Sequence, residues 1–281
     1  MELLWEIILF LVYSLAIVAI SKYILVPVLR KLAESINLKA KTVGNIAGFA
    51  TSVPELLSVC FASVTGLIGT SIYNILSSNV INFVQYMVSV RMNKNVEVLR
   101  SRAITIDLIM VIITILIPIG ILATNFETNL VVVFLFIGLF ALCYYINNNT
   151  HKLYLEKEQH MEEEEIEEEA KWVRGKKKII IKYGVYLILT GIALFIIGNL
   201  LSQTLENLCI RFNIPEIIVG ISLGFITSIP ELITFFESQK HHKNNTRLGV
   251  IEATNNLLTS NTLNLFIIQS IGIILFKIFA P

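Results

Sequence analysis

Long apolar runs constrain this sequence more than any other feature. They last about 20 residues or more, the length of helix that crosses the hydrocarbon core of a bilayer, and short polar stretches separate them. A soluble domain has roughly 45–50% apolar and about 25% charged residues, whereas this 281-residue chain is 55% hydrophobic and 15% charged. Because lipid-exposed backbone must satisfy its own hydrogen bonds, we expect an all-α integral membrane protein.

Eight transmembrane helices are predicted from these runs. Most of the 22 Lys and Arg residues gather in the loops after the first, third, fifth and seventh span. Positively charged loops stay in the cytoplasm, so both termini are predicted to lie outside, with the protein in the cell membrane. The predicted spans are 3–29, 43–65, 67–90, 103–123, 129–147, 179–202, 215–239 and 248–279.

Several function classes are excluded because the sequence lacks the motifs that they require. It has no basic patch interleaved with aromatic residues, so nucleic acid is not an expected partner. It has no glycine-rich nucleotide loop, and all four His residues lie in polar loops, so neither an enzyme nor a cofactor is predicted. The three Cys residues have no metal-binding spacing, and the lack of intramembrane His argues against zinc or copper.

Two motifs occur twice along the chain. GNIAGFATSVPELLS at 44–58 corresponds to GISLGFITSIPELIT at 220–234, and NILSSNVINF at 74–83 corresponds to NLLTSNTLNL at 256–265. The copies lie five spans apart, an odd number, so corresponding helices enter the membrane from opposite sides. Such an inverted-topology repeat is typical of secondary transporters, whose substrate site lies near the bilayer midplane.

The repeat divides the chain into three parts. Residues 1–149 form the first inverted repeat with about five spans, and residues 179–281 form a second, shortened repeat with about three. Residues 150–178 contain EEEEIEEE followed by RGKKK and are expected to be a cytoplasmic loop. The main interpretation of this loop is a solvated, self-repelling segment. A calcium-sensing segment is the alternative, although the spaced ligands of an EF-hand are missing.

Two glutamates inside apolar spans are the strongest candidate ligands. Glu55 and Glu231 occupy matching positions in the two copies of the repeat. An ionisable group near the bilayer centre costs about 2.5–3.5 kcal/mol even on the insertion scale, and a bound cation would compensate for this directly. The alternative is that each Glu bonds a neighbouring helix and serves packing.

Hydroxyl and amide oxygens accompany these glutamates. A Thr-Ser pair lies about one helical turn before each Glu, and the Ser and Asn of each SN-x-x-N motif share a helix face. The proline of each PE motif leaves an earlier carbonyl without its helical partner, and a nearby glycine is expected to ease the break. Such hydroxyls often bond only to their own helix, which is the alternative. The predicted metal-binding residues are Glu55, Glu231, Thr51, Ser52, Thr227, Ser228, Ser78, Asn82, Ser260 and Asn264.

At these residues the chain resembles the calcium/cation antiporter superfamily, and within it the sodium/calcium exchanger branch. The resemblance covers about 44–83 and 220–265. It implies exchange of calcium for sodium by alternating access, with spans 1 and 6 sliding as gating helices against a fixed core. It also implies that Glu55 and Glu231 are the central ligands, and that the calcium and sodium positions are completed by Thr51, Ser52, Thr227, Ser228, Ser78 and Ser260.

The chain departs from the family pattern in two respects that bear on function. Asn82 and Asn264 stand where the family often has an Asp at one position. The family usually has ten spans, whereas eight are predicted here. Three explanations are open: a partner protomer completes the chain in a homo-oligomer, the chain is a fragment, or it is a divergent member of the family. A proton/calcium antiporter and a non-transporting membrane scaffold with the same fold therefore remain alternative functions.

Other polar residues of the spans are expected to have structural roles. Asn79 and Asn261, the remaining amides of the SN motifs, are predicted to point away from the site and to serve packing. Asp107, Glu237 and Glu252 lie near predicted helix ends, where solvation at the membrane interface is expected.

Overall fold

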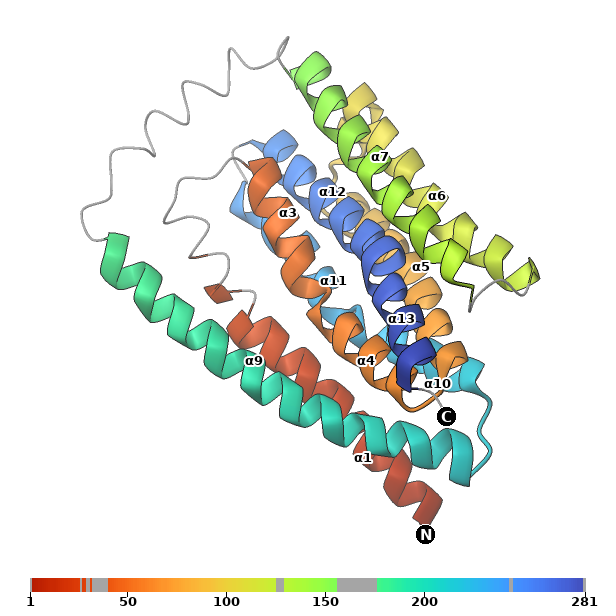
Figure 1. Cartoon of the computed structure of the whole chain (residues 1–281). Helices are drawn as coiled ribbons and strands as arrows, with labels where there is room; N and C mark the ends of the chain where they lie inside the picture. Colours follow the sequence, from red (N-terminus) through yellow and green to blue (C-terminus); the bar gives the residue numbers. More distant parts are fainter. Residues whose placement is uncertain are drawn as a thin grey trace.

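The computed structural model is all-helical over the residues that it describes, namely 2–25, 27–28, 31, 40–124, 129–155, 176–242 and 245–279 (Figure 1). Short π-helical turns continue three of the helices over Ser21–Leu25 (η1), Asn207–Arg211 (η4) and Leu263–Ile268 (η5), and a 3-10 turn covers Val96–Arg100 (η2). The α-helices are α1 (Glu2–Ile20), α3 (Ala40–Thr51), α4 (Val53–Val64), α5 (Ile68–Met92), α6 (Arg102–Thr124), α7 (Leu130–Leu155), α9 (Lys176–Glu206), α10 (Glu216–Thr227), α11 (Ile229–His241), α12 (Thr246–Thr262) and α13 (Gln269–Phe279).

Seven helical stretches of the described residues are long and apolar enough to cross a membrane. They correspond to seven of the eight predicted spans. The predicted span at 67–90 is also helical, as α5, but its buried Asn and Ser residues make it too polar to be counted among the seven. With 25 residues, α5 is about 37 Å long, so its length is sufficient. Residues 156–175, most of the predicted cytoplasmic loop, lie outside the described residues.

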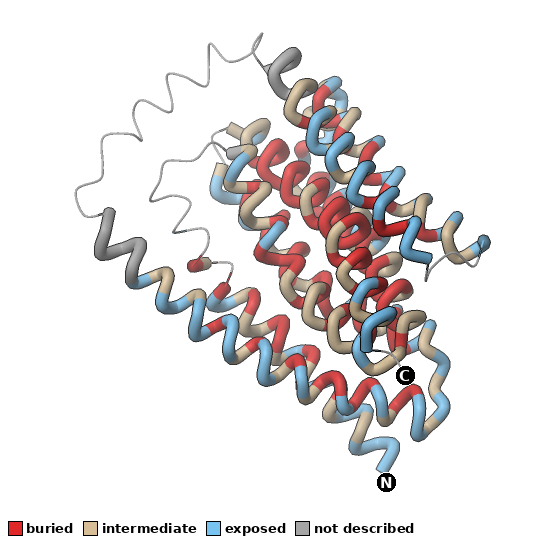
Figure 2. Tube along the Cα trace, viewed as in Figure 1, coloured by how far each residue is buried: buried red, intermediate tan, exposed pale blue. Residues whose placement is uncertain are grey.

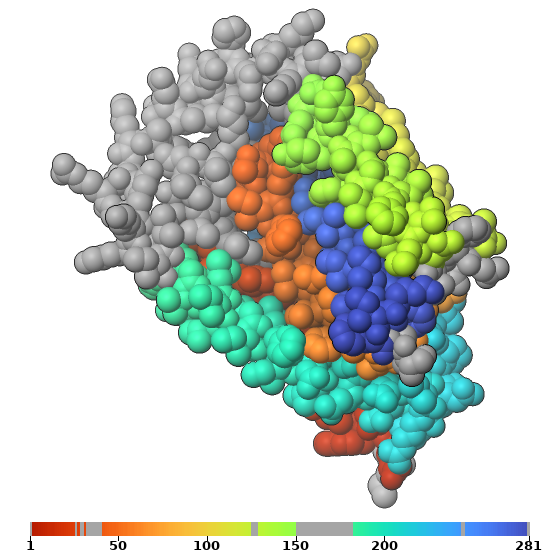
Figure 3. Space-filling view, in the orientation of Figure 1, coloured from red at the N-terminus to blue at the C-terminus, as the bar shows by residue number. Residues whose placement is uncertain are grey.

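Two outer pairs of helices flank a central group (Figure 1). α1 contacts α9 on one flank, and α6 contacts α7 on the other. The central group consists of α5, α12–α13, α3–α4 and α10–α11, and most of the buried residues lie there (Figure 2). Exposed apolar side chains such as Ile188 and Phe134 cover the outer helices, as expected where a surface faces lipid. On one face, α3–α4 reaches the surface between α9 on one side and α7 and α13 on the other (Figure 3).

Two helices of the central group are broken at equivalent serines. α3 passes into α4 at Ser52 and α10 passes into α11 at Ser228, and both serines have φ −79° and ψ 0°. A proline follows two residues later in each case and has no N–H to donate to the preceding turn. In Figure 1, α3 lies above α4 whereas α10 lies below α11. The two broken helices therefore run in opposite directions, as an inverted repeat requires.

Each broken helix packs against a central helix from the other half of the chain. α10 lies along α5, and α3 lies along α12. A Cβ atom on Gly48 would lie 2.6 Å from the backbone oxygen of Asn256, and one on Gly224 would lie 2.7 Å from that of Asn74. Small residues allow membrane helices to approach this closely. The interpretation that these glycines ease the helix break missed their role in packing.

Apolar side chains join the outer pair α1–α9 to the centre. Phe10 and Ile17 of α1 pack with Leu201 and Leu205 of α9 and with Leu223 of α10. Such contacts are non-directional, so a small displacement along the helix axis breaks no specific bond.

Polar contacts join α1 to η4, the π-helical turn that continues α9. The Asn207 amide donates to Glu6 Oε1 over 2.9 Å, and the Arg211 guanidinium donates to Glu2 Oε2 over 2.7 Å. The second pair is more than half exposed, and such surface pairs contribute only about 0–1 kcal/mol. Both bonds hold the two outer helices to each other.

The N-terminus of α5 is capped by another element. Glu216, in the first turn of α10, accepts a hydrogen bond from the backbone N–H of Thr70 over 2.8 Å. Its carboxylate therefore lies at the positive end of the α5 dipole. Replacing Glu216 by Ala is expected to destabilise the protein by about 1 kcal/mol, measured as a lower melting temperature of the detergent-purified protein. The control is Glu206→Ala at an exposed position, and an equal fall in both variants would contradict the capping role.

Candidate cation-binding site

Both repeated glutamates are completely buried in the central group. Glu55 lies in the first turn of α4 and Glu231 in the first turn of α11, and each is 0% exposed. The two helix breaks create these first turns, and the N-terminal end of a helix favours negative charge. Glu231 is also close enough to act electrostatically on Glu55. The fold therefore brings the two acidic groups together in one buried place.

A chain of hydroxyls that begins in the first half of the protein ends on Glu231. Ser260 Oγ on α12 donates to Glu231 Oε1 over 3.0 Å. Ser52 Oγ, at the break between α3 and α4, donates to Ser260 Oγ over 3.0 Å. Thr51 lies beside the same carboxylate. A hydrogen-bonded chain thus runs from the first repeat through Ser260 to Glu231.

Glu55 has the corresponding neighbours without the corresponding bonds. Thr227 and Ser78 lie beside its carboxylate, and their hydroxyl oxygens are 3.4 Å apart. Among the described residues, neither Glu55 oxygen has a hydrogen-bond partner of normal geometry. An ionised group that is buried without a partner costs several kcal/mol. Of the predicted ligands, Glu55 therefore has the greatest need of a positive ion.

Several other oxygens in this cluster also lack a donor. All ten predicted ligands are at most 2% exposed, and nearly all buried polar atoms in proteins have a hydrogen-bond partner. Two carboxylates surrounded by neutral oxygens are the donor set that hard cations such as calcium bind. In addition to both Glu55 oxygens, the atoms without a partner among the described residues include Glu231 Oε2, Ser228 Oγ, Asn82 Oδ1 and Asn264 Oδ1.

Asn74 and Asn256 belong to the same region, although their motif spacing did not single them out. Asn74 Oδ1 lies 3.5 Å from the hydroxyl oxygens of both Ser78 and Thr227. The Asn256 amide donates to the Thr234 hydroxyl. The signal that could have found them is their identity at the first position of both copies of the second motif.

Asn79 and Asn261, which were predicted to point away from the site and to serve packing, bond to each other between α5 and α12. Both are completely buried. Each donates to the backbone oxygen of the other, and each accepts a bond from Asn82 or Asn264. They therefore adjoin two of the predicted ligands.

Of the three acids predicted to be solvated at the interface, Glu237 is exposed, whereas the prediction is wrong for Asp107 and Glu252. Asp107 of α6 is 0% exposed and accepts a bond from the Asn147 amide of α7 over 3.0 Å. Glu252 of α12 is 2% exposed and accepts a bond from Ser238 over 2.7 Å. His242 Nε2 lies 3.0 Å from the second Glu252 oxygen. Neighbouring helices cover both carboxylates, which a position near a helix end does not reveal.

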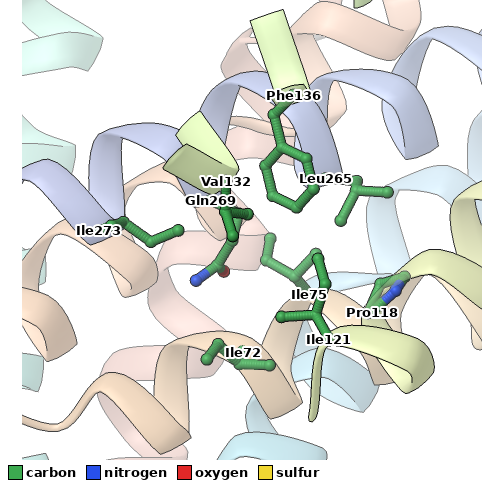
Figure 4. A pocket seen from close by; sticks show the side chains of 9 residues that line it. All are labelled: Ile72, Ile75, Pro118, Ile121, Val132, Phe136, Leu265, Gln269 and Ile273. Carbon is green, nitrogen blue, oxygen red and sulfur yellow. The ribbon is translucent and has the colours of Figure 1, made fainter. Parts of the chain in front are cut away.

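A pocket elsewhere in the molecule has a different chemistry (Figure 4). It lies among α5, α6, α7 and the C-terminal helices. Gln269 is the one polar side chain in its lining, so the pocket offers few ligands to a cation. Among the described residues, no group of three His, Cys, Asp or Glu side chains could hold a metal ion either. The pocket is lined by Ile72, Ile75, Pro118, Ile121, Val132, Phe136, Leu265, Gln269 and Ile273.

Comparison with protein families gives one match over most of the chain. The model of the sodium/calcium exchanger protein family matches residues 6–150 and 182–280. Both copies of the two motifs lie within these ranges, so the match agrees with the resemblance seen in the motifs. Comparison with curated proteins and comparison with solved structures each gave no match.

Proposed function

Because this chain belongs to the sodium/calcium exchanger protein family, we propose that it exchanges calcium for sodium across the membrane by alternating access. The family consists of transporters rather than enzymes. Both ions would bind in turn at the buried site that contains Glu55 and Glu231.

The observation that carries the proposal is the pair of buried carboxylates, of whose four oxygens three have no hydrogen-bond partner among the described residues. Their two negative charges would balance one calcium ion, and the surrounding hydroxyl and amide oxygens would contribute to the six to eight ligands that calcium takes. Sodium would use the same hard oxygen ligands. Because the two ions compete for the same carboxylates, binding of sodium would release calcium, and this competition would couple the two fluxes.

The outer pair α1–α9 is proposed to be the gate. These helices correspond to spans 1 and 6, which the family resemblance identifies as the sliding elements. Their contacts with the central group include a continuous set of aliphatic and aromatic side chains, and the bonds of Asn207 and Arg211 hold them to each other. Movement of the two helices as one unit would open the site to either side in turn.

The proposed orientation rests on the positive-inside rule. The protein would lie in the cell membrane. Both termini would lie outside the cell, and the loop at 150–178 would lie in the cytoplasm.

Uptake of radioactive calcium into proteoliposomes loaded with sodium tests the proposal. We expect uptake that requires internal sodium and is absent from liposomes without protein. A second set of vesicles, with a pH gradient and no sodium, is measured in parallel as the matched comparison.

A proton/calcium antiporter is the second candidate function. With Asn82 and Asn264 in place of an acid, Glu55 and Glu231 are the only ionisable side chains among the predicted ligands, and two carboxylates are sufficient to carry protons. Uptake driven by the pH gradient alone would establish this function instead. No uptake by folded protein under either gradient would favour the scaffold.

A further inference from the structure

We propose that Asn79 and Asn261 are positioning residues, which aim the amide oxygens of Asn82 and Asn264 at the cation. The inference rests on the proposed function, because it concerns ligands of the same site. It starts from a ring of four completely buried asparagines that joins α5 to α12 and the adjoining η5.

Two reciprocal bonds determine how Asn79 and Asn261 are oriented. Asn79 Nδ2 donates to the backbone oxygen of Asn261 over 3.3 Å, and Asn261 Nδ2 donates to the backbone oxygen of Asn79 over 3.1 Å. A backbone oxygen can only accept a hydrogen bond, so the NH₂ group of each side chain must face it. Rotating either amide by half a turn would place two oxygens against each other.

The orientation of this first pair determines that of the second. Asn264 Nδ2 donates to Asn79 Oδ1 over 3.3 Å, and Asn82 Nδ2 donates to Asn261 Oδ1 over 3.2 Å. The NH₂ groups of Asn82 and Asn264 are thus directed into the ring. Their carbonyl oxygens are left over, and neither has a partner among the described residues.

The ring also connects with the carboxylate. Asn82 Nδ2 lies 3.4 Å from Ser260 Oγ, which donates to Glu231. A buried amide oxygen next to this chain is a neutral ligand of the kind that hard cations accept. The same bonds explain why these two positions are neutral in this chain: an Asp at either would place a carboxylate oxygen against the Asn oxygen that now accepts the NH₂ group.

Double-mutant cycles on transport test the proposal. Groups that orient a metal ligand typically contribute 10–100-fold to metal affinity, so Asn79→Ala is expected to raise the KM for calcium about 10-fold. Because Asn79 acts through Asn264, the double variant Asn79→Ala/Asn264→Ala is expected to have the KM of Asn264→Ala alone. The effects of Asn79→Ala and Asn82→Ala are expected to multiply, since Asn82 bonds to Asn261.

If Asn79→Ala does not fold, the equivalent double-mutant cycle in the other half of the ring, Asn261→Ala with Asn82→Ala, is measured instead. The control is Asn95→Ala, which removes another buried amide, in the turn between α5 and η2, one that donates to Gln239. This control is expected to leave the KM for calcium unchanged even if it lowers the melting temperature.

Three outcomes would overturn the proposal. An unchanged KM in folded Asn79→Ala and Asn261→Ala would mean that the ring serves packing alone. A multiplicative effect of Asn79→Ala and Asn264→Ala would mean that Asn79 does not act through Asn264. A wild-type protein that takes up no calcium would refute the proposed function first and this inference with it, and that failure is visible before any variant is measured.

Discussion

Replacing Glu55 or Glu231 by Gln is expected to abolish calcium uptake into proteoliposomes while the protein still folds. Each substitution removes one of the two negative charges that would balance a divalent cation. Removing one partner of a buried, hydrogen-bonded charge pair costs about 2–5 kcal/mol or more, which corresponds to a loss of at least about 30-fold in affinity.

The stability of the same variants separates loss of binding from loss of structure. In the absence of calcium, a neutral amide is easier to bury than a carboxylate without partners. The melting temperature of Glu55→Gln is therefore expected to equal or exceed that of the wild type without calcium. Added calcium is expected to raise the melting temperature of the wild type, because only the folded state binds the ion. This rise is expected to disappear in the variant, which no longer binds calcium.

Glu237→Gln is the matched control for these variants. It makes the same chemical change on α11 at an exposed position, and its uptake is expected to equal that of the wild type. Normal uptake by Glu55→Gln and by Glu231→Gln would refute the two-glutamate site.

The second large effect is expected at the glycines between helices. A Cβ atom at position 224 would contact Ser77 Oγ and would lie 2.7 Å from the backbone oxygen of Asn74 and 2.9 Å from the backbone nitrogen of Ser78. Overpacking of this kind costs about 1–3 kcal/mol. We expect Gly224→Ala to lower the melting temperature clearly and to lower uptake as well, since α10 and α5 must separate and both carry predicted ligands.

Gly191→Ala is the control for this prediction. A Cβ atom there meets no atom within 4 Å, and Ala is the better helix former by about 0.8–1 kcal/mol. The melting temperature of this variant is expected to stay constant or to rise. If Gly224→Ala behaved in the same way, the close contact between α10 and α5 would not matter for stability.

The spans and the composition of the candidate site were predictable from sequence because they depend on local patterns. Burial of a run of apolar residues in lipid requires no partner helix, so seven spans can be recognised from composition and length. The eighth, α5, was predicted from its apolar run in the same way, although its polar residues exclude it from the seven. Glu55 and Glu231 were conspicuous because an acid inside an apolar run needs compensation.

The roles of Asn79, Asn261 and the repeated glycines were not predictable in this way. Helical spacing indicates which residues share a face, but it does not indicate which helix lies opposite. Asn79 was assigned to packing because it does not share the face of Ser78 and Asn82, whereas its partners come from α12 and η5. Gly224 has its role only because the backbone of α5 lies against it.

The sequence by itself determined that this protein spans a membrane, that its two halves repeat, and that two acids with accompanying hydroxyls and amides lie within the spans. Only the tertiary structure decided that each broken helix packs on a central helix of the other half. It also decided that one oxygen of Glu231 accepts a hydroxyl hydrogen bond while both oxygens of Glu55 have none among the described residues. The physical reason is that hydropathy acts along a single helix, whereas hydrogen bonds and close contacts between helices depend on their positions in space.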